Sequence, residues 1–182
     1  ECCAMTTADQ RKILELKRRY SIYAPWSDGA FFRKIIDSLA RPYLRARVDK
    51  VLGLDARGFV LGAALAYRLG VGFAVCRKAG KMYQEGYNPS DVLQESTTDY
   101  SGTVKTLEIE KTAKGIRRGD RVVIVDDWFE TGGQSLAAIR LVERAGGVVV
   151  GVTGMLDDTS EATRVKLEPY GFYPLVRRVR TK

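Results

Sequence analysis

Hydrophobic and polar positions recur along this chain with two different periods, which predict where helices and strands form. Apolar residues spaced three and four positions apart predict helices over 9–20, from Ser27 or Asp28 up to Pro42, and over 58–69, 135–145 and 159–168. Short apolar runs typical of buried strands occupy 51–55, 71–76, 121–125, 148–153 and 172–176, and the alternation of residues 103–109 predicts a further strand. Strands and helices alternate from residue 51 onward. This order predicts a doubly wound α/β fold with a mainly parallel sheet.

The same pattern suggests how the chain is divided. Residues 1–45 are expected to form a small N-terminal helical hood, and residues 46–182 the α/β core, within a length that suits about one domain. A polar stretch from Lys78 to about Gly102 is too long for an ordinary connection. We expect it to act as a flexible lid, over about residues 79–102.

Composition and charge narrow the class of protein. Hydrophobic residues make up 45% and charged residues 29% of the chain, as in globular proteins. The longest apolar runs are too short to cross a bilayer, and the first residues lack the basic and apolar regions of a secretory signal. We therefore expect a cytoplasmic protein without a membrane partner. Met5 would be a natural first residue, which leaves the origin of residues 1–4 open.

The net charge of +8 implies a polyanionic partner, either nucleic acid or a phosphorylated metabolite. Arg177, Arg178, Arg180 and Lys182 cluster at the end of the chain, where we expect a solvated surface. Three cysteines do not make a disulfide framework, and Cys76 closes an apolar run where a buried thiol is expected. The absence of histidine excludes His-based triads and His-ligated zinc.

The strongest chemical signal follows the predicted strand 121–125. After two adjacent carboxylates, Asp126 and Asp127, and two intervening residues come Glu130 and then Thr131-Gly132-Gly133-Gln134-Ser135 at the start of a helix. Small residues let backbone N–H groups converge at a helix N-terminus, which suits a phosphate. The two acids would suit the vicinal hydroxyls of a sugar. A simple glycine turn with Ser or Thr as N-cap is the alternative.

Two further loops place cations at the ends of predicted strands. Asp55-Ala56-Arg57-Gly58 follows the strand 51–55, where the guanidinium can grip an anion through two hydrogen bonds. Arg77-Lys78-Ala79-Gly80-Lys81 follows the strand 71–76. Because ligands bind beyond the carboxyl ends of parallel strands, we expect these loops to meet at one edge of the sheet.

These three segments resemble the signatures of the type I phosphoribosyltransferases, and within that family they are most similar to the adenine phosphoribosyltransferases. The resemblance covers about residues 30–155, including Leu107-Glu108-Ile109-Glu110. It implies displacement of pyrophosphate from phosphoribosyl pyrophosphate by a nucleobase. The expected partners are these two molecules and a second copy of the chain in a homodimer. Mg²⁺ would bind through ligand oxygens rather than in a protein cage.

The resemblance also implies roles for individual residues. Phosphoribosyl pyrophosphate would be bound by Asp55, Ala56, Arg57, Arg77, Lys81, Asp126, Asp127, Glu130, Thr131, Gly132, Gly133, Gln134 and Ser135. The base would be bound by Phe31, Phe32 and Arg33, and catalysis would involve Arg57, Tyr100 and Glu130. For Phe31 and Phe32 a place in the hydrophobic core is an equal alternative. Tyr100 could instead pack the lid against its own strand.

Some positions depart from the adenine subfamily and keep other functions open. Glu130 replaces a usual Ala and resembles the acid that 6-oxopurine enzymes use as a general base. Gln134 replaces Thr, and Lys34 replaces Asp in the hood. A different base therefore remains an alternative to adenine. A non-catalytic regulator that binds nucleic acid is less expected, because about 40 N-terminal residues are too few for a DNA-binding domain and the hood.

Overall fold

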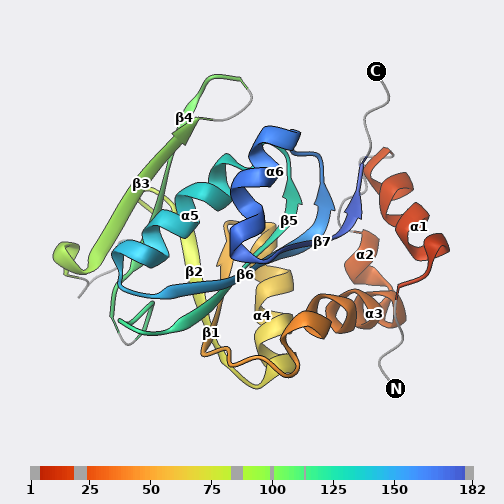
Figure 1. The fold of residues 1–182 in the computed structure, drawn as a ribbon, viewed down its shortest axis with the longest axis horizontal. Helices are drawn as coiled ribbons and strands as arrows, with labels where there is room; N and C mark the ends of the chain where they lie inside the picture. Colours follow the sequence, from red (N-terminus) through yellow and green to blue (C-terminus); the bar gives the residue numbers. More distant parts are fainter. Residues whose placement is uncertain (1–4, 19–23, 83–87, 99–100, 113, 179–182) are drawn as a thin grey trace.

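The computed structural model describes residues 5–18, 24–82, 88–98, 101–112 and 114–178, which are arranged around a seven-stranded sheet (Figure 1). The helices are α1 (Thr7–Arg18), α2 (Ala24–Ser27), α3 (Gly29–Ala40), α4 (Arg57–Leu69), α5 (Gly133–Arg144) and α6 (Glu161–Leu167), with 3₁₀ turns at Arg41–Tyr43, Pro89–Asp91 and Glu168–Tyr170. The strands are β1 (Lys50–Leu54), β2 (Gly72–Lys78), β3 (Val92–Thr98), β4 (Val104–Glu110), β5 (Arg121–Phe129), β6 (Val148–Asp157) and β7 (Phe172–Arg177).

The strand order is β3-β4-β2-β1-β5-β6-β7. Strands β2, β1, β5, β6 and β7 are neighbours in that order and run parallel to one another. Strands β3 and β4 form an antiparallel hairpin that continues the sheet beyond β2. The doubly wound, mainly parallel sheet expected from the sequence is therefore confirmed. Its topology brings the carboxyl ends of β1, β2 and β5 to one edge.

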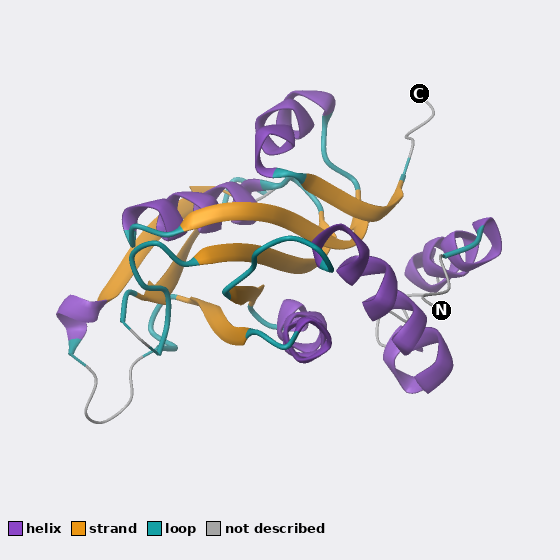
Figure 2. Ribbon diagram, turned by 60° about the horizontal axis from the view of Figure 1, so that its bottom comes forward, coloured by secondary structure: helices purple, strands orange, loops and turns teal. Residues whose placement is uncertain are grey.

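Strand β5 is buried on both faces because consecutive side chains point to opposite sides of the sheet. Val123 and Val125 join a hydrophobic cluster with α3 and α4, and Val122 and Ile124 join a second cluster with α5. Figure 2 shows helices on both sides of the sheet. A strand that must fill two hydrophobic cores has no polar face there, which explains the uninterrupted apolar sequence of residues 122–125.

The N-terminal helices pack onto this core. Ile13 of α1 and Ile35 of α3 lie in the same hydrophobic cluster as residues of α4 and the sheet. Asp28 caps α3 by accepting a hydrogen bond from the backbone N–H of Phe31 at 3.0 Å, and this bond lowers the pKa of Asp28. The boundary at residue 45 stays a prediction. Across the described ranges, no helix has both the length and the apolar character that a membrane span requires.

The loop conformation predicted for residues 79–102 is partly wrong, because β3 occupies Val92–Thr98 within it, whereas the role of a lid stays a prediction. The side chains of β3 alternate between exposed and half-buried, so no apolar stripe reveals the strand in the sequence. Pairing with β4 and ion pairs from Arg140 and Arg144 of α5 to Glu95 hold it in place. The predicted helix 9–20 ends at Arg18, and its last two residues lie outside the described part of the chain.

Candidate active site

A polar pocket of about 320 Å³ opens at the carboxyl edge of the sheet. Strand β5 and the turn into α5 form most of its wall, the loop after β1 forms a second side, and the hairpin β3–β4 a third. The lining residues are Asp55, Ala56, Arg57, Lys78, Thr97, Thr98, Lys105, Asp126, Asp127, Trp128, Phe129, Glu130, Thr131, Gly132, Gln134 and Ser135. The pocket thus unites most residues predicted to bind phosphoribosyl pyrophosphate.

Two adjacent carboxylates stand at the end of β5. Asp127 is 4% exposed, and its Oδ2 lies 2.7 Å from Nε of Arg57. The backbone N–H of Asp127 donates to Oδ1 of Asp126 at 2.9 Å. Burial, and then the negative charge of Asp127, raise the pKa of Asp126 well above its ordinary value. The strand runs on to Phe129 rather than ending at residue 125, and both acids nevertheless line the pocket.

Arg57 reaches these acids because α4 begins directly against β5. A Cβ atom on Gly58 would lie 2.7 Å from the backbone oxygen of Val125, so only glycine allows this approach. The first residue of α4 is Arg57, whose side chain is about one-third exposed. A partly exposed guanidinium over a buried carboxylate leaves donors available to an anion in the pocket.

The turn into α5 is built to expose backbone N–H groups. Gly132 has φ of 76°, a left-handed conformation that favours glycine, and α5 starts at the next residue. The hydroxyl of Thr131 accepts a hydrogen bond from the N–H of Gly133 at 3.3 Å. The first N–H groups of a helix have no partner within it, so this turn can receive a phosphate.

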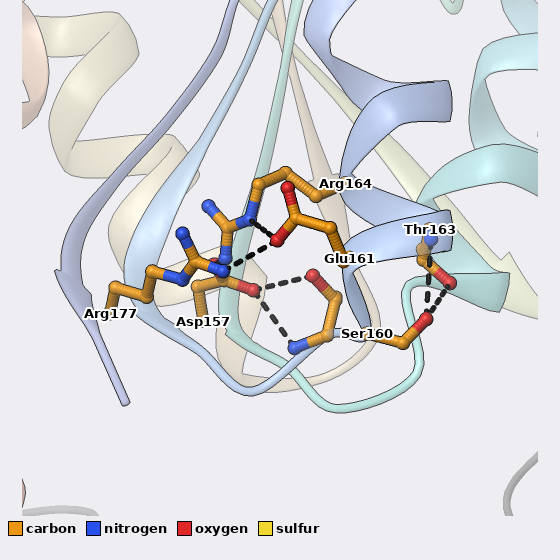
Figure 3. Close-up of polar contacts among 7 residues, drawn as sticks. Asp157, Ser160, Glu161, Thr163, Arg164 and Arg177 are labelled. Atoms are coloured by element: carbon orange, nitrogen blue, oxygen red, sulfur yellow. Dashed lines mark hydrogen bonds and ion pairs between the residues drawn. The ribbon is translucent and has the colours of Figure 1, made fainter. Parts of the chain in front are cut away.

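The connection from β6 to α6 supports that turn from behind. Asp157 is fully buried; it accepts hydrogen bonds from the N–H and hydroxyl of Thr159 and forms an ion pair with Arg164 (Figure 3). Ser160 caps α6 through the N–H of Thr163. A Cβ on Gly132 would lie 2.5 Å from Cγ2 of Thr163, which shows how closely the two connections pack.

Arg77 and Lys81 lie beside the pocket but do not line it. Nε of Arg77 and Nζ of Lys81 lie 3.7 Å and 3.8 Å from Oδ2 of Asp55, and Arg77 also donates to the carbonyl of Lys81 at 2.9 Å. Lys78, expected to be solvated, is exposed and forms part of the pocket wall. The last residue of β2, Lys78, therefore faces the pocket, while Arg77 of the same strand and Lys81 in the following loop contact the buried carboxylate of Asp55.

Comparison with known proteins identifies the family. The phosphoribosyl transferase domain family matches residues 29–170, which include every described element that lines the pocket. This chain belongs to the phosphoribosyltransferase family. It is 40% identical over 151 residues to an adenine phosphoribosyltransferase of Salinispora arenicola, a match covering 83% of this chain and 76% of that protein.

Solved structures agree with this assignment. An adenine phosphoribosyltransferase of Rhodothermus marinus superposes with a TM-score of 0.74 at 36% identity, covering 84% of this chain and 82% of that one. The enzyme of Giardia lamblia, solved with 9-deazaadenine, gives a TM-score of 0.75 at 28% identity, with 87% and 85% covered. The resemblance inferred from the sequence motifs is confirmed at the level of family and fold.

The predicted base-binding residues of this phosphoribosyltransferase do not line the pocket. Phe31 is 5% exposed and lies in the hydrophobic cluster of α3 and α4, with Nζ of Lys12 4.1 Å from its ring centre. Phe32 packs edge-on against Trp26, and Arg33 is exposed. For Phe31 the structure thus agrees with the alternative of a core position. Tyr100, the predicted lid residue, lies outside the described residues.

The structure adds pocket residues that the motifs did not single out. Trp128 follows the two acids, and Thr97, Thr98 and Lys105 come from the hairpin β3–β4. Trp128 could have been noticed as a large aromatic residue inside a polar motif, whereas the hairpin residues depend on a strand that the sequence did not reveal. The buried Cys76 is confirmed, and burial raises its pKa, so its thiol stays protonated and inert at neutral pH.

Proposed function

We propose that this chain is an adenine phosphoribosyltransferase, which converts adenine and phosphoribosyl pyrophosphate to adenosine monophosphate and pyrophosphate in purine salvage. One observation carries the proposal: a single pocket joins two acids, an arginine and a glycine turn at a helix start, in a chain similar to enzymes of that name. Chemically, the bond from ribose C1 to the pyrophosphate oxygen breaks, and a bond from C1 to a ring nitrogen of the base forms.

The pocket offers a distinct group to each part of the substrate. The turn from Thr131 to Ser135 would hold the 5′-phosphate through backbone N–H groups and the helix dipole. Asp126 and Asp127 would accept hydrogen bonds from the ribose hydroxyls. Since bond breaking runs ahead of bond making, positive charge grows on the ribose, and these carboxylates would stabilise it.

The leaving pyrophosphate carries the opposite charge. Arg57 and Lys78 line the pocket on the side of the β1 and β2 loops, where they would contact it. Arg77 and Lys81 contact Asp55 beside the pocket and add positive potential to this side of it. Preorganised cations stabilise charge that develops in the transition state without reorganising during the reaction, which favours departure of pyrophosphate.

A magnesium ion fits this arrangement through the substrate. The acids at the pocket are few, and within the described ranges no three acidic or cysteine side chains come together as a metal cage. Mg²⁺ prefers oxygen ligands, and phosphate groups of a substrate commonly supply them. It would therefore bind mainly to oxygens of phosphoribosyl pyrophosphate. When bound, the ion would neutralise charge on the leaving group.

Glu130 favours a second candidate, a phosphoribosyltransferase for a 6-oxopurine. Its half-buried side chain lines the pocket one residue before the phosphate turn. There it could accept the proton that the attacking ring nitrogen loses. The resemblance of this acid to the one in 6-oxopurine enzymes is the reason to include hypoxanthine, guanine and xanthine in the test below.

The test is release of pyrophosphate when adenine, hypoxanthine, guanine, xanthine and uracil are added in turn with Mg²⁺ and phosphoribosyl pyrophosphate. We expect release with adenine alone, with omission of phosphoribosyl pyrophosphate as the blank. Release with hypoxanthine or guanine but not adenine would establish the second candidate. Silence with all five bases, together with tight binding of phosphoribosyl pyrophosphate, would indicate a regulator instead.

Four further expectations complete the proposal. We propose a homodimer in the cytoplasm, with residues 1–45 as a hood over the α/β core and Tyr100 in a lid over the pocket. Sedimentation velocity would test the dimer, and limited proteolysis would test the boundary near residue 45.

A further inference from the structure

The pocket offers one aromatic ring to a planar ligand. Trp128 and Phe129 are the aromatic residues among those that line it. Phe129 is 1% exposed, and its ring packs edge-on against Phe172 with 5.0 Å between ring centres. Trp128 is half-buried, so part of its indole remains accessible. A base stacking within the described pocket would therefore meet Trp128.

The orientation of this indole is set by an acid that does not line the pocket. Nε1 of Trp128 donates a hydrogen bond to Oδ2 of Asp158 at 2.9 Å. The side chain of Asp158 is 1% exposed, and Nη1 of Arg178 lies 3.7 Å from the same oxygen. The backbone N–H of Asp158 donates to the carbonyl of Phe129 at 2.9 Å, which ties the acid to the end of β5.

Such a contact restricts the ring more than packing alone. A hydrogen bond to an ionised acceptor is stronger and more directional than one between neutral groups. It holds the indole in one orientation before the ligand arrives, so less conformational freedom is lost on binding. A misoriented ring would weaken stacking without disturbing the groups that bind phosphate.

We propose that Asp158 is a positioning residue for the nucleobase: it fixes the plane of Trp128, on which the base stacks. This inference rests on the proposed function, since it assumes that a base enters the pocket. It assigns Asp158 a role in base affinity and none in binding phosphoribosyl pyrophosphate or in the chemical step.

Steady-state kinetics of Asp158→Ala test the proposal. We expect KM for adenine to rise about tenfold, as for loss of one charge-assisted hydrogen bond, while kcat and KM for phosphoribosyl pyrophosphate change less than about twofold. Asp158→Asn keeps an oxygen that can accept the indole N–H, and should raise KM for adenine less than about threefold. An unchanged KM for adenine in Asp158→Ala would overturn the proposal.

Trp128→Phe provides the matched background, because it keeps a ring and removes the N–H. If Asp158 acts through Trp128, Asp158→Ala should have no further effect on KM in that background. An equal effect in both backgrounds would mean that Asp158 has a structural role only, and would reject the proposal.

NMR spectroscopy can detect the hydrogen bond between Trp128 and Asp158 directly. Trp26→Phe leaves Trp128 as the single tryptophan, so its indole N–H gives one NMR signal. We expect this signal to move and to exchange faster with solvent in Asp158→Ala, and to be largely restored in Asp158→Asn. An unmoved signal would contradict the contact. If the unaltered chain forms no product from adenine, the proposed function is rejected, whereas the role of Asp158 is still tested by comparing KM for the base that the chain accepts.

Discussion

The segment from β5 into α5 and the helix α3 both resemble ligand-binding segments of the family, yet their side chains meet very different surroundings. At the end of β5, Asp127 contacts Arg57 from a buried position, and the pKa of Asp126 is raised by burial and by its neighbour's charge. In α3, Phe31 and Ile35 are buried among apolar residues, and Asp28 caps the helix.

This difference separates two physical roles. The β5 segment holds like charges together in a partly desolvated pocket, which weakens the fold but prepares the site for a ligand. Helix α3 buries apolar surface and satisfies its first backbone N–H groups, which stabilises the fold. Substitutions should therefore reduce activity and spare stability in the first region, and do the reverse in the second.

Asp126→Asn should have the largest effect. We expect kcat/KM to fall about 10²-fold or more, because an acceptor that stabilises the ribose in the transition state is lost. The free protein should melt at a higher temperature than the unaltered chain. A raised pKa means that the ionised carboxylate is disfavoured in the folded state, so this gain should grow as pH rises through that pKa.

Calorimetry and initial rates across pH measure both effects of Asp126→Asn. Asp91→Asn, at a residue that does not line the pocket, is the control and should change neither quantity. A lower melting temperature for Asp126→Asn at neutral pH would contradict the view that this region sacrifices stability.

Glu130→Ala should reduce turnover by about one to two orders of magnitude if the carboxylate is a general base. Glu130→Gln keeps the size and polarity of the side chain but cannot take a proton, so it should be as slow. Single-turnover rates at saturating substrates measure this step. A rate like that of the unaltered chain in both variants would exclude Glu130 as the base.

The central strands β1 and β5 were predictable because both of their faces must be apolar to fill the cores. Val122–Val125 illustrates this, since no polar residue could occupy either face. The hairpin strand β3 was not predictable, because its stability comes from pairing with β4 and from ion pairs to α5 rather than from an apolar stripe. Local patterns reveal burial, but not strands held by distant polar contacts.

The site shows the same division. The acids, Arg57 and the glycine turn were predictable, since a short motif fixes their spacing at a strand end. The role proposed for Trp128 in base stacking was not predictable, because it depends on the hydrogen bond to Asp158, which lies 30 residues away in the sequence. Phe31 was ambiguous because stacking on a base and packing in a core both require an aromatic residue, and only the fold separates them.

Phe31→Leu tests the second region. Replacement of a buried ring by a smaller apolar side chain should lower the free energy of unfolding by about 1–1.5 kcal/mol. KM for adenine should change less than about twofold. Phe32→Leu, at the half-buried neighbour, is the matched control and should cost less stability. Urea unfolding and kinetics distinguish the two roles, because a large rise in KM with little loss of stability would identify Phe31 as a base contact.

Asp9→Asn should have the smallest effect and tests whether a charge also stabilises the packing of the N-terminal helices α1 and α3. Asp9 of α1 lies 2.5 Å from Nζ of Lys34 of α3, and hydrogen bonds from Lys34 and then Thr6 lower its pKa to about 2. A lowered pKa means that the stabilisation is present above the unfolded value of about 4 and is lost as pH falls towards 2.

We expect Asp9→Asn to lower the free energy of unfolding by about 0.5–1 kcal/mol at pH 7, since the pair is partly exposed to solvent. The difference from the unaltered chain should shrink between pH 4 and pH 2, whereas the gain in Asp126→Asn grows as pH rises. Lys34→Met removes the other partner and should follow the same pH dependence. A difference that does not vary with pH would mean that Asp9 acts only through its neutral hydrogen bonds with Thr6, and that the ion pair contributes nothing to joining α1 and α3.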